Sequence, residues 1–291
     1  NRRDVDVAIV EVCKIIDLGE GKVGLIPTTS MGNTSSFVQS AKKVIVEVNV
    51  TQPVALEGMH DSYVPLDPPC REPIPVVESG TIIGTPYIPC EVEKIAAVVA
   101  CDITDTERVK EAVKATMDKF GRVDILMNNA GTGAVANAED ITDEQFKKEL
   151  DIDLFGTFAC AREFGKEMIK AKYGRIINIA SMYGLVGNMI VGSAPYHAAK
   201  GGVVNLTRAL AAEWGKHGIT VNSICPGYFY TDLTTATLDS AFFQAIAKRS
   251  IPLERYGHAG ELDTCALFLA SPASSYVNGQ NIAVDGGYTC V

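Results

Sequence analysis

The chain has 291 residues, 47% of them hydrophobic, which suits one large α/β domain or two smaller ones. Its net charge is -9 and its pI is near 5.0, with no run of lysine or arginine, so neither nucleic acid nor a membrane surface is an expected partner. Eight cysteines are scattered singly without a cysteine–histidine cluster, which argues against a metal site and indicates reduced thiols in a cytoplasmic protein. We expect small molecules and further copies of the chain as partners.

The first hundred residues are predicted to contain strands rather than long helices. Residues 5–12 and 44–50 have the composition of strands, and the only stretch typical of a helix lies around residues 35–42. The apolar stretch near the start contains Glu11 and Lys14, so it predicts neither a signal peptide nor a membrane span. Prolines interrupt much of the rest: Pro53, Pro65, Pro68, Pro69, Pro73, Pro75, Pro86 and Pro89.

A literal G-x-G-x-x-G match occupies residues 19–24, the glycine spacing of dinucleotide-binding loops. Such a loop needs a following helix, because the helix N-terminus receives the pyrophosphate. Here the sequence continues into Leu25-Ile26-Pro27, and Glu20 would place a carboxylate beside the phosphates. We therefore interpret the segment as a turn between two strands. Residues 1–100 contain no other candidate for a strand, glycine turn and helix in that order.

In the remainder of the chain, the hydrophobic period alternates between that of a helix and that of a strand. Two helices are expected to begin at capping boxes, Thr104 with Glu107 and Thr142 with Gln145. The first of them is amphipathic and is expected to end at Gly121. Further helices are expected at about 196–214 and 262–269, and strands at 123–127, 175–180, 219–225 and 282–285. This alternation predicts a doubly wound parallel sheet with helices on both faces.

Three residues in this part have the chemistry of a general acid–base site. Tyr196 and Lys200 are four residues apart on a predicted helix, so both side chains project from one face. An ammonium about 4 Å from a phenol, at an effective dielectric constant of about 20, favours the phenolate by roughly 4 kcal/mol. Ser181 ends a predicted strand, at the sheet edge where open α/β folds bind ligands, and its hydroxyl can hydrogen-bond a carbonyl oxygen. Tyr-x-x-x-Lys alone is also typical of a solvated surface pair, so the surrounding motifs decide.

Several short motifs accompany these three residues: Asn128-Asn129-Ala130-Gly131, Asn178 before the serine, Pro226-Gly227 with Thr231, and Asp285-Gly286-Gly287. Together and in this order they resemble the short-chain dehydrogenase/reductase family over residues 101–291. The resemblance implies a Rossmann-type α/β fold, NAD or NADP as cofactor, and reversible conversion of a small-molecule alcohol to a ketone. It also implies a homo-oligomer, a tetramer built on the helices around Phe158 and Val203.

The resemblance assigns a role to each residue that matches a family motif. Tyr196 is the expected catalytic acid and base, Lys200 promotes its ionisation and binds the nicotinamide ribose, and Ser181 polarises the substrate carbonyl. Where the family usually has an asparagine that holds a proton-relay water, this chain has Asp153, a carboxylate that can also hold water with an altered pH dependence. The expected cofactor contacts are Asp102 at the adenine, Asn129, Ala130 and Gly131 along the cofactor, and Pro226, Gly227 and Thr231 around the nicotinamide.

Three further comparisons with the family pattern bear on function. The amino-acid sequence around Asp153 and Pro226 is similar to that of the gluconate 5-dehydrogenase branch of the family, which implies a sugar acid or polyol as substrate. Ser181 and Tyr196 are slightly further apart than is usual in the family, which predicts a longer loop between them, through two glycines at 187 and 192. The glycine-rich loop of the family is missing, and with it the segment that selects NAD or NADP.

The first hundred residues contain a second set of motifs, at residues 4–14, 26–34, 44–49, 57–61 and 84–89. They resemble an internal fragment of the acetate and 4-hydroxybutyrate CoA-transferases, which are related to acetyl-CoA hydrolases. The nucleophilic glutamate of that family belongs to a later domain that is absent here, so no catalytic residue is carried over. His60 beside Asp61 is more typical of a structural or exposed pair than of a general base.

The sequence thus predicts a chimera of a CoA-transferase-like fragment (residues 1–100) and an incomplete doubly wound Rossmann-type domain (residues 101–291). Three functions remain open: an NAD(P)-dependent oxidoreductase, an inactive hybrid with an impaired cofactor site, and a CoA-transferase remnant without its nucleophile. The inactive hybrid is considered because the missing first strand would neighbour the strand ending near Met127 and cover its edge. The resemblances meet around residues 93–108, and gene fusion, recombination and a sequence-assembly error would each produce such a joint.

Overall fold

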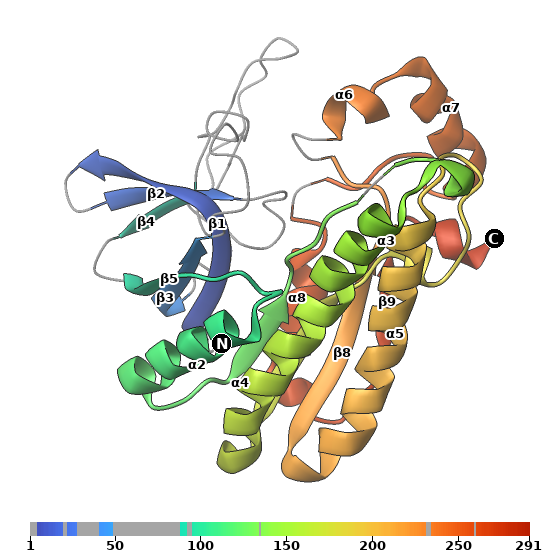
Figure 1. The fold of residues 1–291 in the computed structure, drawn as a ribbon. Coiled ribbons are helices and arrows are strands. Elements are labelled where there is room, and N and C mark those ends of the chain that lie inside the picture. Colours follow the sequence, from blue (N-terminus) through green and yellow to red (C-terminus); the bar gives the residue numbers. More distant parts are fainter. Residues whose placement is uncertain are drawn as a thin grey trace. The chain divides into compact units, whose positions relative to one another are not determined.

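The structure is a computed structural model, drawn as a ribbon in Figure 1. It describes residues 5–19, 22–27, 41–48, 88–91, 95–133, 135–230, 234–258 and 260–291. The chain divides into two compact units, one made of residues 1–100 and 231–236 and the other of residues 101–230 and 237–291.

The first unit contains a five-stranded mixed sheet with the order β4-β2-β1-β3-β5. Strand β1 pairs antiparallel with β2 and parallel with β3, and β3 pairs parallel with β5. Strand β4 pairs antiparallel with β2. The strands are β1 (Val5–Gly19), β2 (Lys22–Pro27), β3 (Ala41–Val48), β4 (Ile88–Glu91) and β5 (Ile95–Ala100).

The pairing of β1 with β2 shows the structural role of the glycine motif at residues 19–24. Gly19 lies opposite Lys22 in an antiparallel pair, so the motif joins two strands, as predicted, and β1 does not lead into a helix. The predicted strands at 5–12 and, as far as Val48, at 44–50 are confirmed. The predicted helix at 35–42 is wrong at its end, because residues 41 and 42 begin β3, whose β-branched residues favour a strand. Its first six residues lie outside the described residues.

The second unit is an α/β structure built on a parallel sheet with the order β6-β7-β8-β9, which confirms the fold class. Its strands are β6 (Ile125–Asn128), β7 (Gly174–Ile179), β8 (Ile219–Pro226) and β9 (Asn281–Val284), each within two residues of its predicted position. The helices are α2 (Thr106–Phe120), α3 (Asp143–Leu150), α4 (Thr157–Ala171), α5 (Ala194–Trp214), α6 (Thr235–Leu238), α7 (Ala241–Ser250) and α8 (Asp263–Ala270).

Helices cover both faces of this sheet. Helix α4 packs on β6 and β7, and α5 packs on β8. Helix α8 contacts β7 and β8 from the other side of the sheet (Figure 1). The core between α5 and the sheet contains Ala180, Val203, Val204 and Cys225, all buried, with Leu154 packed against them. The tetramer built on the helices around Phe158 and Val203 stays a prediction, and the Val203 side chain itself lies inside the unit.

The start of α2 differs from the prediction. Asp105, not Thr104, caps the helix, and its carboxylate accepts a hydrogen bond from the Glu107 backbone N–H. The backbone N–H and hydroxyl of Thr104 instead donate to Asp102 Oδ1, over 2.9 and 2.7 Å. Because the Thr104 hydroxyl is bonded to the Asp102 carboxylate, it does not cap the helix. Helix α2 ends as predicted at Gly121, which has a left-handed φ of 70°.

The segment between α3 and α4 positions a candidate site residue. The predicted capping box of α3 is present, with Thr142 and Gln145 bonded to each other's backbone. After α3, the helical path continues as a π-helix over Asp151–Gly156 before α4 begins. Insertions of this kind are frequent at functional sites, because they rotate the side chains that follow. Asp153 lies at the centre of this segment.

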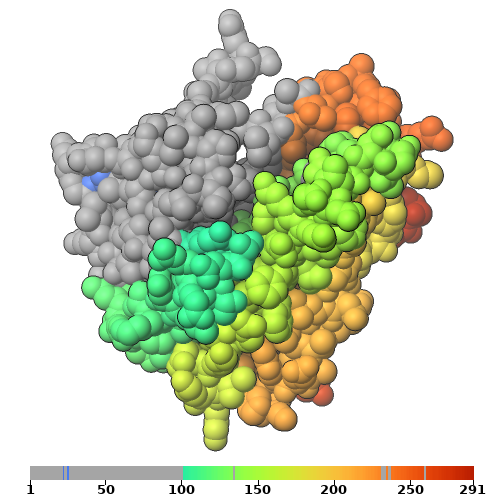
Figure 2. All heavy atoms as spheres, in the orientation of Figure 1, coloured from blue at the N-terminus to red at the C-terminus, as the bar shows by residue number. Residues whose placement is uncertain are grey.

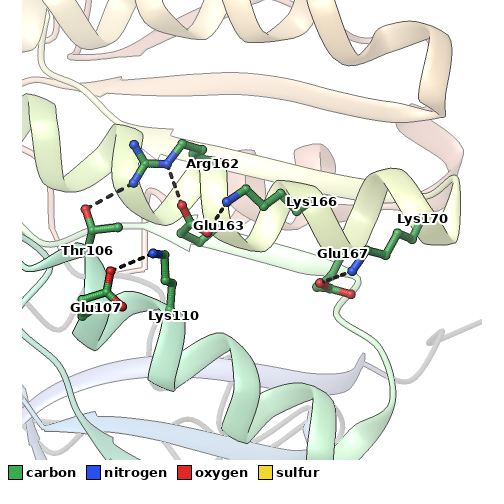
Figure 3. A network of polar contacts seen from close by, with 8 residues as sticks. All are labelled: Thr106, Glu107, Lys110, Arg162, Glu163, Lys166, Glu167 and Lys170. Carbon is green, nitrogen blue, oxygen red and sulfur yellow. Dashed lines mark hydrogen bonds and ion pairs between the residues drawn. The ribbon is translucent and has the colours of Figure 1, made fainter.

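Helices α2 and α4 are joined by a polar network that Figure 3 shows from close by. Arg162 on α4 donates to the Thr106 hydroxyl on α2 over 3.2 Å and to Glu163 over 2.6 Å. Lys166 donates to the other oxygen of Glu163. Burial opposes ionisation of Glu163, but these cationic donors outweigh it and lower the pKa of its carboxyl. Figure 2 shows the outer faces of the two helices at the surface of this unit.

No helix in the described part of the chain is long and apolar enough to cross a membrane. Over the same residues, no group of three or more histidine, cysteine and acidic side chains is arranged to hold a metal ion.

Candidate active site

The carboxyl ends of the parallel strands bring most of the candidate residues to one edge of the second sheet. Asn129, Ala130 and Gly131 follow β6, Ser181 follows β7, and Pro226 and Gly227 lie at the end of β8. The loops after β8 and β9 are in close contact, because a Cβ on Gly227 would lie 2.7 Å from Asp285 Cα. This edge is where open α/β sheets bind their ligands.

A buried row of polar side chains fixes the strands and α5 behind this edge. Asn128 Nδ2 donates to Asn178 Oδ1 over 2.9 Å, and Asn178 Nδ2 donates to the Thr207 hydroxyl over 2.9 Å. Thr207 in turn donates to the Val203 carbonyl over 2.8 Å. Because buried amides without partners are costly, this row holds β6, β7 and α5 in one relative position.

Tyr196 and Lys200 lie together on α5, as their spacing predicts. The ammonium of Lys200 lies 5.6 Å from the centroid of the Tyr196 ring. Lys200 is buried, and its Nζ donates to the Ile179 carbonyl over 3.1 Å at the end of β7. Asp153 Oδ2 lies 3.9 Å from the same Nζ. The lysine is therefore held between a strand carbonyl and a carboxylate, beside the half-buried tyrosine.

Asp153 is completely buried, and its Oδ1 accepts a hydrogen bond from the Thr132 backbone N–H over 2.8 Å. A Cβ on Gly131 would lie 2.8 Å from that oxygen and 3.1 Å from Lys200 Nζ, so the close approach of the loop after β6 requires glycine. Burial raises the pKa of the Asp153 carboxyl, although Lys200 and the Thr132 N–H both favour its charged form. The structure thus brings Gly131, Asp153, Lys200 and Tyr196 into one cluster.

Ser181 lies at the same sheet edge and is also buried. Its Oγ accepts the Tyr183 backbone N–H over 3.1 Å and so caps a short turn, Met182–Gly184. This turn packs on α5, because a Cβ on Gly184 would lie 2.7 Å from the Lys200 carbonyl oxygen. No hydrogen bond among the described residues joins Ser181 to Tyr196 or Lys200.

The loop between Ser181 and Tyr196 packs against the segment that follows β6. The Ala136 backbone N–H donates to the Gly192 carbonyl over 3.0 Å, and a Cβ on Gly192 would lie 2.4 Å from the Ala136 carbonyl oxygen. A Cβ on Gly133 would lie 3.8 Å from the Tyr196 ring, so this segment also lines the tyrosine. The loop between Ser181 and Tyr196 therefore makes a close contact beside the site, whereas its unusual length stays a prediction.

Two of the predicted cofactor residues, Asp102 and Thr231, remain to be located. Asp102 lies directly after β5, where its carboxylate accepts both hydrogen bonds from Thr104. Thr231 lies outside the described residues.

A group of tyrosines beside the site was not predicted from the sequence. The hydroxyls of Tyr183 and Tyr228 are 2.5 Å apart, and both rings pack edge-on against Tyr288. Tyr183 also stacks on His197 with 4.8 Å between ring centroids. Burial raises the pKa of Tyr183 far above its ordinary value, so this phenol stays protonated. These tyrosines could have been identified from their positions in the sequence, because each of the three follows a site motif by one or two residues.

Two protein families match the chain, each over a different part of it. Residues 89–289 match the family model described as enoyl-(acyl carrier protein) reductase. Residues 1–100 match the N-terminal domain of acetyl-CoA hydrolase/transferase, so the two matches overlap at residues 89–100.

Relatives with related activities match the larger part. The chain is 39% identical over 193 residues to a 3-oxoacyl-[acyl-carrier-protein] reductase of Synechocystis sp., covering 66% of this chain and 75% of that protein. It is 39% identical over 190 residues to the D-threitol dehydrogenase of Mycolicibacterium smegmatis, covering 65% and 72%. Among solved structures, a gluconate 5-dehydrogenase from Burkholderia cenocepacia in complex with NADP and tartrate aligns with a TM-score of 0.73 and 26% identity, covering 100% of this chain and 97% of the other.

The extent of these matches, the parallel sheet and the motifs at its edge agree with one another. The chain belongs to the short-chain dehydrogenase/reductase family of oxidoreductases, and it is a chimera whose first hundred residues match the acetyl-CoA hydrolase/transferase family.

Proposed function

We propose that the protein is an NAD(P)-dependent oxidoreductase that interconverts a secondary alcohol and a ketone, with Tyr196 as the acid and base. The observation that carries this proposal is the placement of Lys200. Its buried ammonium lies beside the Tyr196 ring and is held by the Ile179 carbonyl and Asp153. A cation fixed beside a phenol stabilises negative charge that develops on the phenol oxygen during proton transfer, which suits Tyr196 to exchange a proton with the substrate oxygen.

Ser181 is the proposed donor to the substrate oxygen. It lies at the carboxyl end of β7, and among the described residues its hydroxyl only accepts a hydrogen bond, from the Tyr183 N–H. The hydroxyl proton therefore remains to be donated to a carbonyl oxygen, where it would stabilise negative charge as it develops. Its short turn packs on the Lys200 backbone, which fixes the hydroxyl relative to α5.

The nicotinamide end of NAD(P) fits the residues at this edge. Lys200 would bind the ribose, Asn129, Ala130 and Gly131 would lie along the cofactor, and Pro226, Gly227 and Thr231 would border the nicotinamide. When bound, the nicotinamide gives or accepts the hydride. Asp102 remains the proposed adenine contact. The choice between NAD and NADP is left to the binding assay, although the structural relative named above contains NADP.

We propose a sugar acid or polyol as the substrate. The relatives named above include a D-threitol dehydrogenase and a gluconate 5-dehydrogenase, whose names describe a polyol and a sugar acid. We further propose that residues 1–100 and 101–291 form separate domains, and that the protein is a cytoplasmic homo-oligomer, by family a tetramer.

An inactive hybrid is the second candidate, and the strand arrangement favours it. In the part of the chain that the structure describes, the second sheet ends at β6, and β1 is followed by its antiparallel partner β2 instead of a helix that could receive a pyrophosphate. The remaining alternative, a CoA-transferase remnant, lacks a nucleophile in the sequence.

The test is a spectrophotometric assay of the purified chain with gluconate and D-threitol, using NAD⁺ and NADP⁺ separately. We expect formation of the reduced cofactor with at least one pair, and none from the Tyr196→Phe variant. A folded chain that reduces neither cofactor with these substrates, and oxidises neither reduced cofactor with the corresponding ketones, would favour the inactive hybrid. Acyl-CoA exchange that is unaffected by the tyrosine change would favour the transferase remnant.

A further inference from the structure

Three tyrosines follow the ends of three neighbouring strands at the candidate site. Tyr183 follows β7, Tyr228 follows β8 and Tyr288 follows β9. The hydroxyls of Tyr183 and Tyr228 are 2.5 Å apart and form one hydrogen bond. Among the described residues, no carboxylate, amide or backbone carbonyl accepts a hydrogen bond from either hydroxyl. The bond between the two hydroxyls uses one of their two protons, so the other remains to be donated.

We propose that the hydroxyl pair of Tyr183 and Tyr228 donates a hydrogen bond to a second oxygen atom of the substrate, and that it thereby selects a substrate with several hydroxyl groups over a simple secondary alcohol. This inference rests on the proposed function, because it concerns the substrate of that site. Tyr196 and Ser181 act on the oxygen that reacts, whereas the tyrosine pair acts on an oxygen further along the carbon chain.

The Tyr183 side chain extends from the proposed substrate donor toward α5. Its backbone N–H donates to Ser181 Oγ over 3.1 Å, so residue 183 begins beside the hydroxyl that is proposed to bind the reacting oxygen. Its ring stacks on His197, which follows Tyr196 on α5, with 4.8 Å between the ring centroids. The Tyr183 ring therefore lies beside α5, at the sheet edge that also carries Ser181.

Packing holds the other tyrosine of the pair in place. The Tyr228 ring lies edge-on to Phe243 and Tyr256, with 6.0 and 5.7 Å between ring centroids. Tyr256 is itself buried and packs with Leu238 and Ala247. These contacts occupy the ring of Tyr228 and leave its hydroxyl for polar contacts. A donor whose position is fixed before binding loses little conformational entropy when the ligand arrives.

Both phenols keep the proton that the proposal requires. Burial raises the pKa of Tyr183 and of Tyr228 above the ordinary value of a tyrosine. The hydroxyl that accepts a bond from its partner also becomes a stronger donor, because hydrogen bonds in a chain polarise one another. A hydroxyl or carboxylate oxygen of a substrate can accept a bond from it, whereas an alkyl group cannot.

The imidazole beside Tyr183 lacks a hydrogen-bond donor. His197 Nδ1 lies 2.8 Å from the Ser193 carbonyl oxygen, which only accepts, so Nδ1 carries the proton and Nε2 has a free lone pair in the neutral ring. Nε2 is buried without a hydrogen-bond partner among the described residues. A hydroxyl group both donates and accepts, so a polyol carries the kinds of group that the phenol pair and this nitrogen lack.

Two matched alcohols test the selection. D-threitol and 2-butanol are both four-carbon secondary alcohols, but only D-threitol carries further hydroxyl groups. In Tyr183→Phe and Tyr228→Phe, kcat/KM for D-threitol should fall about tenfold, mainly through KM, with kcat/KM for 2-butanol little changed. The larger loss identifies the tyrosine that donates to the substrate. Tyr256→Phe is the control, because its hydroxyl donates to the Phe243 carbonyl, and it should leave the ratio between the two alcohols unchanged.

Ligand binding separates this inference from the proposed function. D-threitol and gluconate are titrated onto the wild-type chain and both phenylalanine variants, with and without NADH or NADPH, and followed by saturation-transfer NMR. We expect the wild type to bind at least one compound, and each variant to bind it about tenfold more weakly. This result without turnover would contradict only the proposed function. A wild type that binds neither compound, variants that bind as well as the wild type, or equal losses for D-threitol and 2-butanol would overturn the selection role.

Discussion

The two units of the chain use their strands in different ways. In the second unit, four strands run parallel, so the loops after β6, β7 and β8 meet at one edge and carry Gly131, Ser181 and Gly227. In the first unit, β1 turns directly into an antiparallel partner, and the backbone after it is used for pairing within the sheet. The all-parallel arrangement brings successive carboxyl ends to the same edge, so residues distant in sequence meet there.

The residues proposed for acid–base chemistry lie in the second unit, whereas the residues that would anchor the cofactor pyrophosphate in this family would come before it. The second unit places the proposed acid–base tyrosine and its lysine by itself, through contacts that all lie between residues 128 and 207. The family's glycine-rich anchor for the pyrophosphate would precede this unit, where the chain instead matches a CoA-transferase sequence.

The largest expected effect comes from removing the proposed acid and base. Tyr196→Phe keeps the ring beside Lys200 but removes the proton, so kcat should fall by about two to four orders of magnitude. His60→Ala changes the one His–Asp neighbour pair of the first part and should leave kcat unchanged. Steady-state rates of cofactor reduction measure both. A large loss of kcat in His60→Ala, together with a small loss in Tyr196→Phe, would show that the chemistry lies in the first unit and not in the second.

A smaller effect is expected where the loop after β6 meets the charged cluster. Gly131→Ala would force a Cβ against Asp153 and Lys200, and we expect it to cost about 1–3 kcal/mol of folding free energy and to lower activity. Gly187→Ala is the control, because a Cβ there meets nothing within 4 Å. Urea unfolding of both variants gives the comparison. Equal stabilities would show that the loop lies further from the cluster than described.

The smallest expected effect lies in the α2–α4 network. Glu163→Gln should lower stability by about 1–2 kcal/mol at pH 7, because the buried carboxylate accepts from two cations. The folded pKa of Glu163 is lowered from 4.5, so this contribution is present above that value and is lost as pH falls through the folded pKa. Unfolding midpoints of wild type and variant should therefore converge in acid.

A surface pair provides the control for that prediction. Asp118→Asn removes the exposed partner of Lys114, and we expect a change below about 0.5 kcal/mol at any pH. A gap between wild type and Glu163→Gln that stays constant from pH 7 into acid would show that the loss comes from packing rather than from the charge.

Much of the second unit was predictable because local signals agree with its fold. The strands are apolar and short, Gly121 ends α2, and Thr142 with Gln145 begins α3. The N-cap of α2 was misplaced by one residue because Thr104 and Asp105 are both good caps, and only the bond from Thr104 to Asp102 decides between them. Helix α7 was not predicted, although Ser240 caps its N-terminus by accepting a hydrogen bond from the Phe243 backbone N–H.

The residues of the site could be predicted from the sequence, but most of the contacts between them could not. Helical spacing placed Tyr196 and Lys200 on one face, and strand ends placed Ser181 at the ligand-binding edge. The approach of Asp153 to Lys200 was not predictable, because Asp153 lies in a π-helix over residues 151–156 that no local pattern specifies. The order of strands in the first unit depends on pairings between segments distant in sequence, which no local pattern specifies.

Binding of NADPH or NADH to the full chain, followed by cofactor fluorescence, tests the central claim most directly. Tyr196→Phe is included, since it should bind cofactor normally and so separates binding from catalysis. We predict saturable binding by both proteins, because Gly131, Lys200 and Gly227, which we propose to contact the cofactor, all belong to the second unit. A folded wild-type chain that binds neither cofactor would contradict the account and identify the protein as a family member that has lost its function.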